Sequence, residues 1–177
     1  VIEHDKTLAQ LHAADTSGAR FIEVITGRTL TSHPTDPLTT IIDDSTCTAP
    51  AECGALLLAA HRRGGQQFWL ATELSLPPSA QLGSVERPVL IVAPGRLNLS
   101  GNSAIRGLVI AGELHIDDTS AGTVAVVGAL AVRGDVVQGA GALDVTYDRS
   151  ALGMAGGTPM GLLTPVPGTW RDQLAGY

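Results

Sequence analysis

The segments GRLNL (95–99), GELHI (112–116), GALAV (128–132) and GALDV (141–145) repeat one pattern. Each begins with a glycine, has a leucine two residues later, and has a second aliphatic residue after two more. Such alternation is typical of β-strands, because successive side chains of a strand point to opposite faces. The glycines are spaced by 17, 16 and 13 residues. This spacing is too short for a helix pair or a propeller blade, and it predicts the stacked coils of a β-solenoid.

An alignment of the four segments assigns a structural role to each position. Gly95, Gly112, Gly128 and Gly141 are predicted to form corners, where a side chain would obstruct the bend. Stacked strands lie about 4.8 Å apart, so equivalent aliphatic residues form columns inside the solenoid. The predicted core residues are Leu97, Leu99, Leu114, Ile116, Leu130, Val132, Leu143 and Val145.

The residues between these core positions are predicted to face outward in two columns. One column contains Asn98, His115, Ala131 and Asp144, and the other contains Arg96, Glu113, Ala129 and Ala142. They form either a groove that binds a ligand or a solvated face, on which Arg96 and Glu113 make an exposed ion pair. In this register, Leu130→Asp is expected to destabilise the chain, whereas Ala131→Asp changes little.

The first half of the chain predicts helices with short strands. Residues 5–26 have apolar side chains at helical spacing, and Gly27 is a suitable stop. Residues 39–43 and 66–76 predict strands. Residues 49–63 predict a helix that has a proline in its first turn and basic residues in its last, an order that suits the helix dipole.

These patterns together predict an α+β fold in two parts. We expect an N-terminal helix and a small α/β part in residues 1–86, followed by a β-solenoid of about four coils in residues 87–177. The end of a solenoid exposes unpaired backbone groups, so both ends need a cover. We expect the N-terminal part to cover the first coil, and the tail around Trp170 to pack on the flank or on the last coil.

Composition and charge limit the classes of function. The formal net charge of −6 argues against nucleic-acid binding through phosphate contacts. Cys47 and Cys53, with five residues between them, are compatible with a disulfide in an oxidising compartment, and two free thiols are the alternative. The chain has no catalytic motif and no metal-ligand spacing. We therefore expect a protein that is not an enzyme and that needs no cofactor.

Residues 88–172 resemble the C-terminal region of PilX-like minor pilins of type IV pili. The resemblance rests on the segments RGLVIAGELHI, VVGALAVRGDV, GALDVTYDRSAL and the closing TWRD. It implies a structural subunit that acts in pilus assembly or adhesion, with other minor and major pilins as partners and a host or environmental surface as a further one. It also implies a location in the bacterial inner membrane and periplasm, and then in the extracellular fibre.

In pilins, the first helix begins as an apolar membrane anchor and continues into the soluble domain. Residues 5–26 resemble such a continuation, so the resemblance implies an anchor that would precede Val1.

Two other classes of protein share the predicted solenoid. Bactofilins are cytoplasmic β-helices that polymerise, and their resemblance to this chain is confined to its solenoid half. A small glycan-binding or glycan-cleaving β-helix is the second alternative. Glycan-cleaving β-helices are usually much longer and need acidic and basic groups on one face, whereas Arg96, Arg106 and Arg133 are scattered along the sequence.

Overall fold

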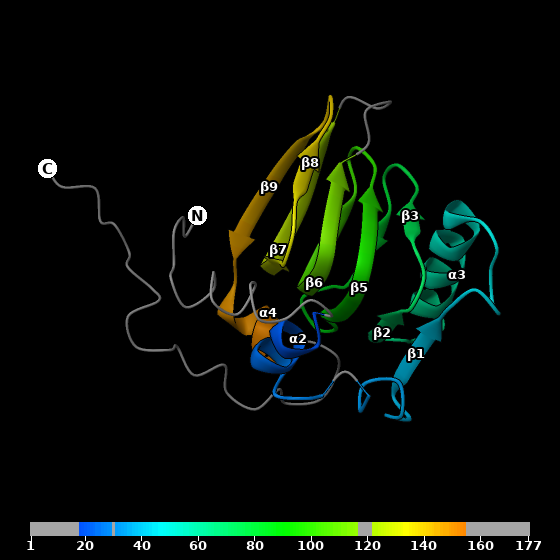
Figure 1. Ribbon diagram of the computed structural model, residues 1–177. Coiled ribbons are helices and arrows are strands. Elements are labelled where there is room, and N and C mark those ends of the chain that lie inside the picture. Colours follow the sequence, from blue (N-terminus) through cyan, green and yellow to red (C-terminus); the bar gives the residue numbers. More distant parts are fainter. Residues whose placement is uncertain (1–17, 30, 117–121, 155–177) are drawn as a thin grey trace, which may run out of the picture.

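The computed structural model describes residues 18–29, 31–116 and 122–154. They form a parallel β-solenoid of about four coils, which confirms the predicted solenoid (Figure 1). Every strand pair in it is parallel. The strands are β1 (Thr39–Ile42), β2 (Gln67–Leu70), β3 (Leu74–Leu76), β4 (Gln81–Leu82), β5 (Val89–Leu99), β6 (Ala104–Ile116), β7 (Thr123–Val132), β8 (Val136–Gln138) and β9 (Ala142–Tyr147).

The strand pairing gives the solenoid three walls. Wall A stacks residues 39–42, 67–70, 89–93, 107–111 and 128–132. Wall B stacks residues 74–76, 96–99, 113–116 and 136–138. Wall C stacks residues 81–82, 104–106, 123–127 and 142–147. One coil consists of one strand segment from each wall in turn, so the first coil is β2, β3 and β4. The solenoid therefore begins at Gln67, before the boundary at residue 87 that the sequence suggested.

The corner between walls C and A depends on two stacked glycines. Gly107 and Gly128 are ladder partners with φ of 145° and 137°, a region that residues with a side chain rarely adopt. A Cβ at Gly107 would lie 1.9 Å from the Val89 carbonyl oxygen, and one at Gly128 would lie 2.0 Å from the Gly107 carbonyl oxygen. Only glycine allows successive coils to approach this closely at the bend.

The four predicted corner glycines do not form one column, so the predicted register is wrong. Gly112 and Gly95 do share the corner between walls A and B. Gly128 belongs instead to the corner between walls C and A. Gly141 immediately precedes β9, at the corner between walls B and C. The physical reason is that the coil is longer than 16 residues: ladder partners in wall B are Leu74, Leu97, Leu114 and Val136, at steps of 23, 17 and 22.

The predicted core residues therefore belong to three separate walls. Leu97 stacks on Leu114, and Leu99 on Ile116, as expected, and all four side chains are buried. In contrast, Leu130 stacks on Val109 and Val132 on Ala111. Leu143 stacks on Val124 and Val145 on Val126. Leu130, Val132 and Leu143 are partly buried against the interior cluster, while Val145 is 45% exposed and is not a core residue in the described chain.

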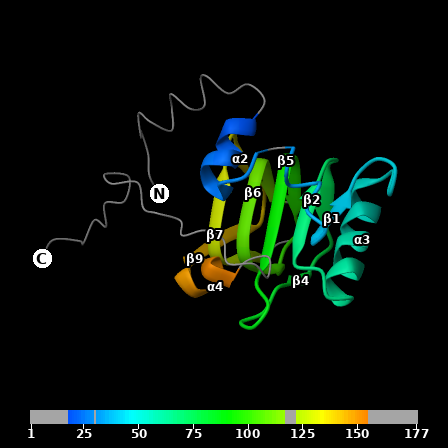
Figure 2. The same cartoon turned by 90° about the horizontal axis from the view of Figure 1, so that it is seen from below.

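Wall A is apolar on both sides. Its inner side faces the solenoid interior, and its outer side forms a second cluster around Trp69, Leu90 and Ile110. The helix α2 (Ala19–Thr26) places Ile22 in this outer cluster, and α4 (Arg149–Met154) adds Leu152 (Figure 2). A strand covered on both faces reads as a continuous hydrophobic run rather than an alternating one, as VLIVA at the start of β5 does. Of the predicted helix 5–26, only residues 18–26 lie within the described chain.

The helix α3 (Pro50–Arg62) covers the first coil, as the sequence predicted for the N-terminal part. Its residues Cys53, Leu57 and Ala60 are buried in the interior cluster. Gly54 lies directly against β3, where a Cβ would be 2.0 Å from the Ser75 carbonyl oxygen. Figure 1 shows α3 beside β3, at the opposite end of the stack from β8 and β9. The predicted cover of the last coil around Trp170 lies outside the described residues.

Candidate interaction surface

The outer side of wall B carries a cluster of polar side chains, which we call the polar ladder. Two neighbouring columns of the wall supply it, one residue per coil in each. The members of the polar ladder are Glu73, Ser75, Arg96, Asn98, Glu113 and His115. Ladder partners on one wall lie one above another, so these side chains are held in register by the backbone pairing beneath them.

Hydrogen bonds and ion pairs join the polar ladder from end to end. The Asn98 amide nitrogen donates to Glu73 Oε1 at 2.8 Å and to Ser75 Oγ at 3.0 Å. Arg96 Nε donates to Glu113 Oε2 at 3.3 Å, and Arg96 Nη1 lies 3.8 Å from Glu73 Oε1. His115 Nε2 lies 3.7 Å from Glu113 Oε2. Two carboxylates therefore flank one guanidinium.

The polar ladder is open to solvent. The Arg96, Glu73 and Glu113 side chains are each more than two-fifths exposed, so their ion pairs contribute at most about 1 kcal/mol each. The same exposure leaves carboxylate, amide and guanidinium groups accessible to a polar partner. Within residues 18–29, 31–116 and 122–154, no group of three histidine, cysteine or carboxylate side chains has a spacing that could hold a metal ion.

The two predicted outward columns are only half correct. Arg96 and Glu113 are ladder partners, as are Asn98 and His115, and the predicted Arg96–Glu113 ion pair forms. Ala129 and Ala131 lie instead on wall A and pack against its outer cluster. Ala142 and Asp144 lie in β9, on wall C. A ligand groove along the predicted columns is therefore not formed.

Sequence reasoning missed Glu73 and Ser75, because it placed residues 66–76 outside the solenoid. One signal was present: Leu74 and Leu76 have the same spacing as Leu97 and Leu99, their ladder partners. No glycine precedes Leu74 by two residues, so a search for the repeated pentapeptide passes over this strand.

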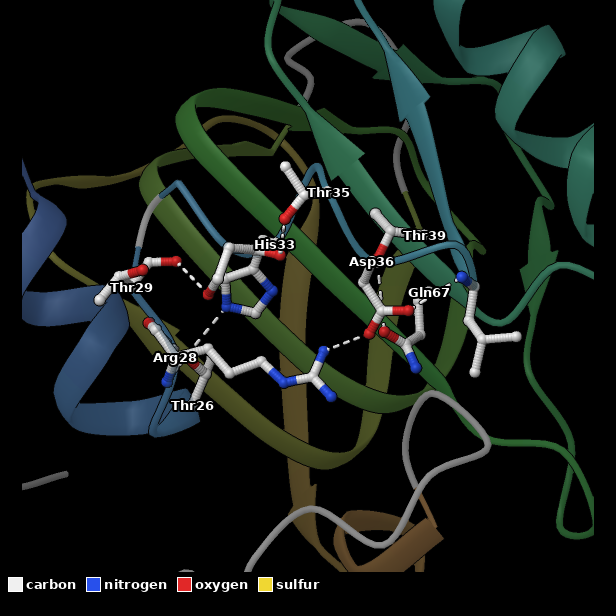
Figure 3. Close-up of polar contacts among 10 residues, drawn as sticks. Thr26, Arg28, Thr29, His33, Thr35, Asp36, Thr39 and Gln67 are labelled. Atoms are coloured by element: carbon white, nitrogen blue, oxygen red, sulfur yellow. Dashed lines mark hydrogen bonds and ion pairs between the residues drawn. The ribbon is translucent and has the colours of Figure 1, made fainter.

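A second polar cluster lies in the connection between α2 and β1 (Figure 3). His33 is buried and its ring stacks on Trp69, with ring centroids 5.5 Å apart. The Thr26 hydroxyl donates to the Ile22 carbonyl oxygen, so it accepts a hydrogen bond from His33 Nε2 at 3.0 Å. Arg28 and Asp36 form an ion pair at 2.5 Å in the same segment. These contacts fasten α2 to the outer cluster of wall A, which indicates a structural role.

This cluster predicts a pH dependence of stability. Burial, together with the nearby Arg28 guanidinium, lowers the pKa of His33, and Asp36 opposes this only in part. A lowered pKa in the folded state means that stability is complete above the unfolded-state pKa of about 6.5 and is lost as the pH falls below it. We expect the free energy of unfolding, measured by urea denaturation, to fall between pH 7 and 5, and to fall less steeply in His33→Gln.

Carboxylates act in a separate pH window. A backbone hydrogen bond from Leu38 and the Arg28 side chain lower the pKa of Asp36, and hydrogen bonds from Ser150 lower the pKa of Asp148. Their contribution is lost only as the pH falls below about 4. If the free energy of unfolding falls equally steeply between pH 7 and 5 in the wild type and in His33→Gln, the pH dependence does not come from His33.

The predicted disulfide is confirmed. Cys47 and Cys53 are bonded, with a Cα–Cα distance of 5.3 Å, and both are buried in the interior cluster. The bond ties the first turn of α3 to the segment that precedes it, so it holds the cover in place over the first coil.

Loss of this bond is expected to lower the free energy of unfolding by about 2 kcal/mol, by the chain-entropy estimate for so short a loop. Urea denaturation with and without a reductant measures the effect. In Cys47→Ala/Cys53→Ala, the reductant should make no further difference. If the stability of the wild type does not change on reduction, the bond has no role in holding the cover.

Two further polar side chains, His61 and Asp148, serve the fold. His61 Nε2 accepts a hydrogen bond from the Gly83 amide at 3.1 Å, which leaves Nδ1 to donate to the Gly65 carbonyl oxygen at 3.1 Å. Asp148 accepts hydrogen bonds from the Ser150 amide and hydroxyl at the start of α4, and it pairs with Arg106. His61 therefore joins the end of α3 to the corner after β4, and Asp148 fixes the start of α4.

Comparisons with known proteins give no relative: no protein family, curated protein or solved structure matches this chain. In the part of the chain that the structure describes, no helix combines the length and the apolar character needed to span a bilayer.

Proposed function

We propose that this chain is a structural subunit of an extracytoplasmic assembly, of the minor-pilin type, and that it acts through its surfaces in pilus assembly or adhesion. The observation that carries the proposal is the buried Cys47–Cys53 disulfide at the cover of the solenoid. Disulfides persist in oxidising compartments and are rare in the cytosol. A scaffold whose end cover depends on such a bond suits the periplasm and the cell surface.

The covered first coil further favours this reading over a cytoskeletal polymer. A β-helix that polymerises end to end must expose pairing surfaces at both ends of the stack. Here α3 fills the end at β3, with Leu57 and Cys53 inserted into the interior. Such a chain suits a subunit that ends a stack or projects from a filament, in contact with other minor and major pilins.

A deletion of the gene in the source organism, complemented by the wild-type gene, tests the proposed role in pilus assembly or adhesion. We expect the deletion to reduce piliation or a pilus-dependent behaviour, and an antibody against the chain to detect it in fibres sheared from complemented cells. Normal piliation, twitching and adhesion in the deletion strain, together with absence of the chain from sheared fibres, would overturn the proposal.

Glycan binding is the second candidate function, and the polar ladder favours it. An exposed array of carboxylate, amide and guanidinium groups at fixed spacing suits a hydroxyl-rich ligand. A glycan array probed with the purified chain tests this. Binding should be lost in Asn98→Ala and retained in Thr146→Ala, an exposed substitution on wall C. Equal binding by the two variants would place the ligand elsewhere.

A further inference from the structure

The turn from wall C to wall A after the first coil is longer than the solenoid requires. In the next two coils this corner is a single bend, at Gly107 and at Gly128. After the first coil it consists of residues 83–88, which lie between β4 and β5. The strands on either side keep their pairing with the next coil, so the extra residues are not needed to stack the coils. Loops that a scaffold does not need for its own packing are common sites of function.

This turn is built so that it presents an apolar side chain to solvent. The Ser84 amide donates to the Arg87 carbonyl oxygen at 3.1 Å, and the Arg87 amide donates to Ser84 Oγ at 3.1 Å. These bonds close a tight turn around Val85 and Glu86, and Val85 is 59% exposed. Such turn positions usually hold glycine, proline, asparagine or aspartate, because these residues favour the bend. A valine at this position buries little within the chain, so its value lies in contact with something else.

Three arginines adjoin the turn. Arg62 and Arg63 are exposed at the end of α3, and Arg87 is exposed within the turn itself. Arg87 Nη2 donates to the Gly64 carbonyl oxygen at 2.7 Å, so the third guanidinium is held beside the end of the helix. The hydrogen bond that His61 accepts from the same turn is a second link. The turn and the end of α3 therefore form one fixed surface.

This surface is basic, although the chain as a whole is acidic. We call it the basic corner, and its members are Arg62, Arg63, Val85, Glu86 and Arg87. Three arginines and one glutamate give it a net charge of +2, against −6 for the whole chain. In the part of the chain that the structure describes, none of the three guanidiniums forms an ion pair. The dipole of α3 favours basic residues at the end of this helix, but it explains neither Arg87 nor Val85.

We propose that the basic corner binds the anionic headgroups of a lipid bilayer, with its guanidiniums on the phosphates and Val85 at the boundary with the acyl chains. Guanidinium groups pair with phosphate oxygens through two parallel hydrogen bonds. An apolar side chain among cations suits the interfacial layer of a membrane, whereas a soluble acidic partner needs only the cations. The inference goes beyond the proposed function and does not depend on it, because it concerns a surface of the purified chain.

The charge of the chain also sets the orientation of this contact. An anionic bilayer attracts the basic corner and repels a chain whose net charge is otherwise negative. The basic corner lies at the end of the solenoid that α3 covers. Binding therefore places the covered end at the membrane and directs the last coil away from it.

Co-sedimentation of the purified full chain with vesicles tests the proposal. We expect the chain to bind vesicles of phosphatidylglycerol and phosphatidylcholine in equal parts, and not to bind vesicles of phosphatidylcholine alone. Binding should weaken as salt is added, because ions screen exposed charges. Arg62→Gln/Arg63→Gln should lower the partition of the chain onto the anionic vesicles at least about tenfold.

The double variant Arg20→Gln/Arg149→Gln is the matched control. It removes the same charge from two exposed arginines, on α2 and α4, and should bind the anionic vesicles nearly as the wild type does. Val85→Ser keeps every charge and should also lower the binding, because the apolar contact is lost. All these side chains are exposed, so the circular dichroism of each variant should match that of the wild type.

Three outcomes would overturn the proposal. The first is absence of binding to the anionic vesicles. The second is an equal loss of binding in the two double variants, because the effect then follows the net charge of the chain and not its position. The third is binding to soluble poly-L-glutamate as tight as that to the vesicles, with no effect of Val85→Ser on either, which would assign the basic corner to an acidic protein. If Arg62→Gln/Arg63→Gln does not fold, Arg62→Gln alone serves in its place, with the same expected direction.

Discussion

Replacement of Leu114 by Asp is expected to abolish most of the stability of this protein. Leu114 is fully buried at the centre of the solenoid and lies between Leu97 and Val136 in one interior column. The change removes a large apolar side chain and places a carboxylate among the aliphatic residues of the interior cluster. We expect a loss of at least about 4 kcal/mol, which is comparable with the total stability of a small domain.

Urea denaturation followed by circular dichroism measures this effect, and Val137→Asp is the control. Val137 is the ladder partner of His115, in an outward column of the same wall, and its side chain is exposed. Its replacement should change the free energy of unfolding by no more than about 0.5 kcal/mol. If both variants denature like the wild type, the assignment of inner and outer faces on wall B is wrong.

The structure changes the expected effects of the two substitutions that the sequence suggested, Leu130→Asp and Ala131→Asp. Leu130→Asp was expected to destabilise the chain and Ala131→Asp to be neutral. Leu130 lies in the last coil and is only partly buried, so its replacement should cost less than that of Leu114. Ala131 packs against the outer cluster of wall A, so an aspartate there is not a neutral control.

Gly128→Ala is expected to be the second most damaging change. The new Cβ would lie 2.0 Å from the Gly107 carbonyl oxygen, in a backbone conformation with φ of 137°. The atom in its path belongs to the backbone of the adjacent coil, so no side-chain rotation can relieve the overlap. The two coils must separate at the corner, and we expect a loss of about 3 kcal/mol or more in the free energy of unfolding.

Gly95→Ala is the matched control for this prediction. Gly95 was predicted to be equivalent to Gly128, but a Cβ at Gly95 would have no neighbour within 4 Å. Its replacement by alanine should change the stability by no more than about 0.5 kcal/mol. Equal effects of the two substitutions on the urea midpoint would show that the close approach of coils at Gly107 and Gly128 does not limit stability.

The solenoid could be predicted from the sequence because its local pattern is strong. A glycine at a corner, followed by inward side chains at every second position, is visible at Gly95, Gly112, Gly128 and Gly141. The disulfide and the helix at residues 50–62 could be predicted for similar local reasons. Each depends on residues close together in the chain, where spacing carries the information.

The register could not be predicted in this way, because all three walls use the same pattern. Any strand that leaves a corner glycine has its inward residues two and four positions later, whichever wall it enters. Gly107 is followed by Val109 and Ala111 rather than by a leucine, so the corner that pairs with Gly128 was overlooked. Which strand stacks on which is set by corner lengths and by contacts between neighbouring coils, whose residues are far apart in the sequence, and neither leaves a periodic signal.

Four of the six residues of the polar ladder could be predicted from the sequence. Arg96, Asn98, Glu113 and His115 follow recognised corners, and their pairing could be predicted. Glu73 and Ser75 come from a strand without a corner glycine. The buried position of His33 could not be predicted. Its contact with Trp69 joins a connecting segment to the outer side of wall A, and neither of these two residues lies in a repeated segment.

Unequal corners have a consequence for how such a protein evolves. The turn from wall C to wall A takes residues 83–88 after the first coil, but only a single bend at Gly107 after the second, while the strands on either side keep their pairing. Insertions and deletions at corners therefore leave the buried side chains in place. Within a strand, an insertion or deletion of one residue would turn the following inward side chains to the outer face. Among descendants of this chain, variation in length should gather along three ridges parallel to the long axis, separated by three flat faces of constant width.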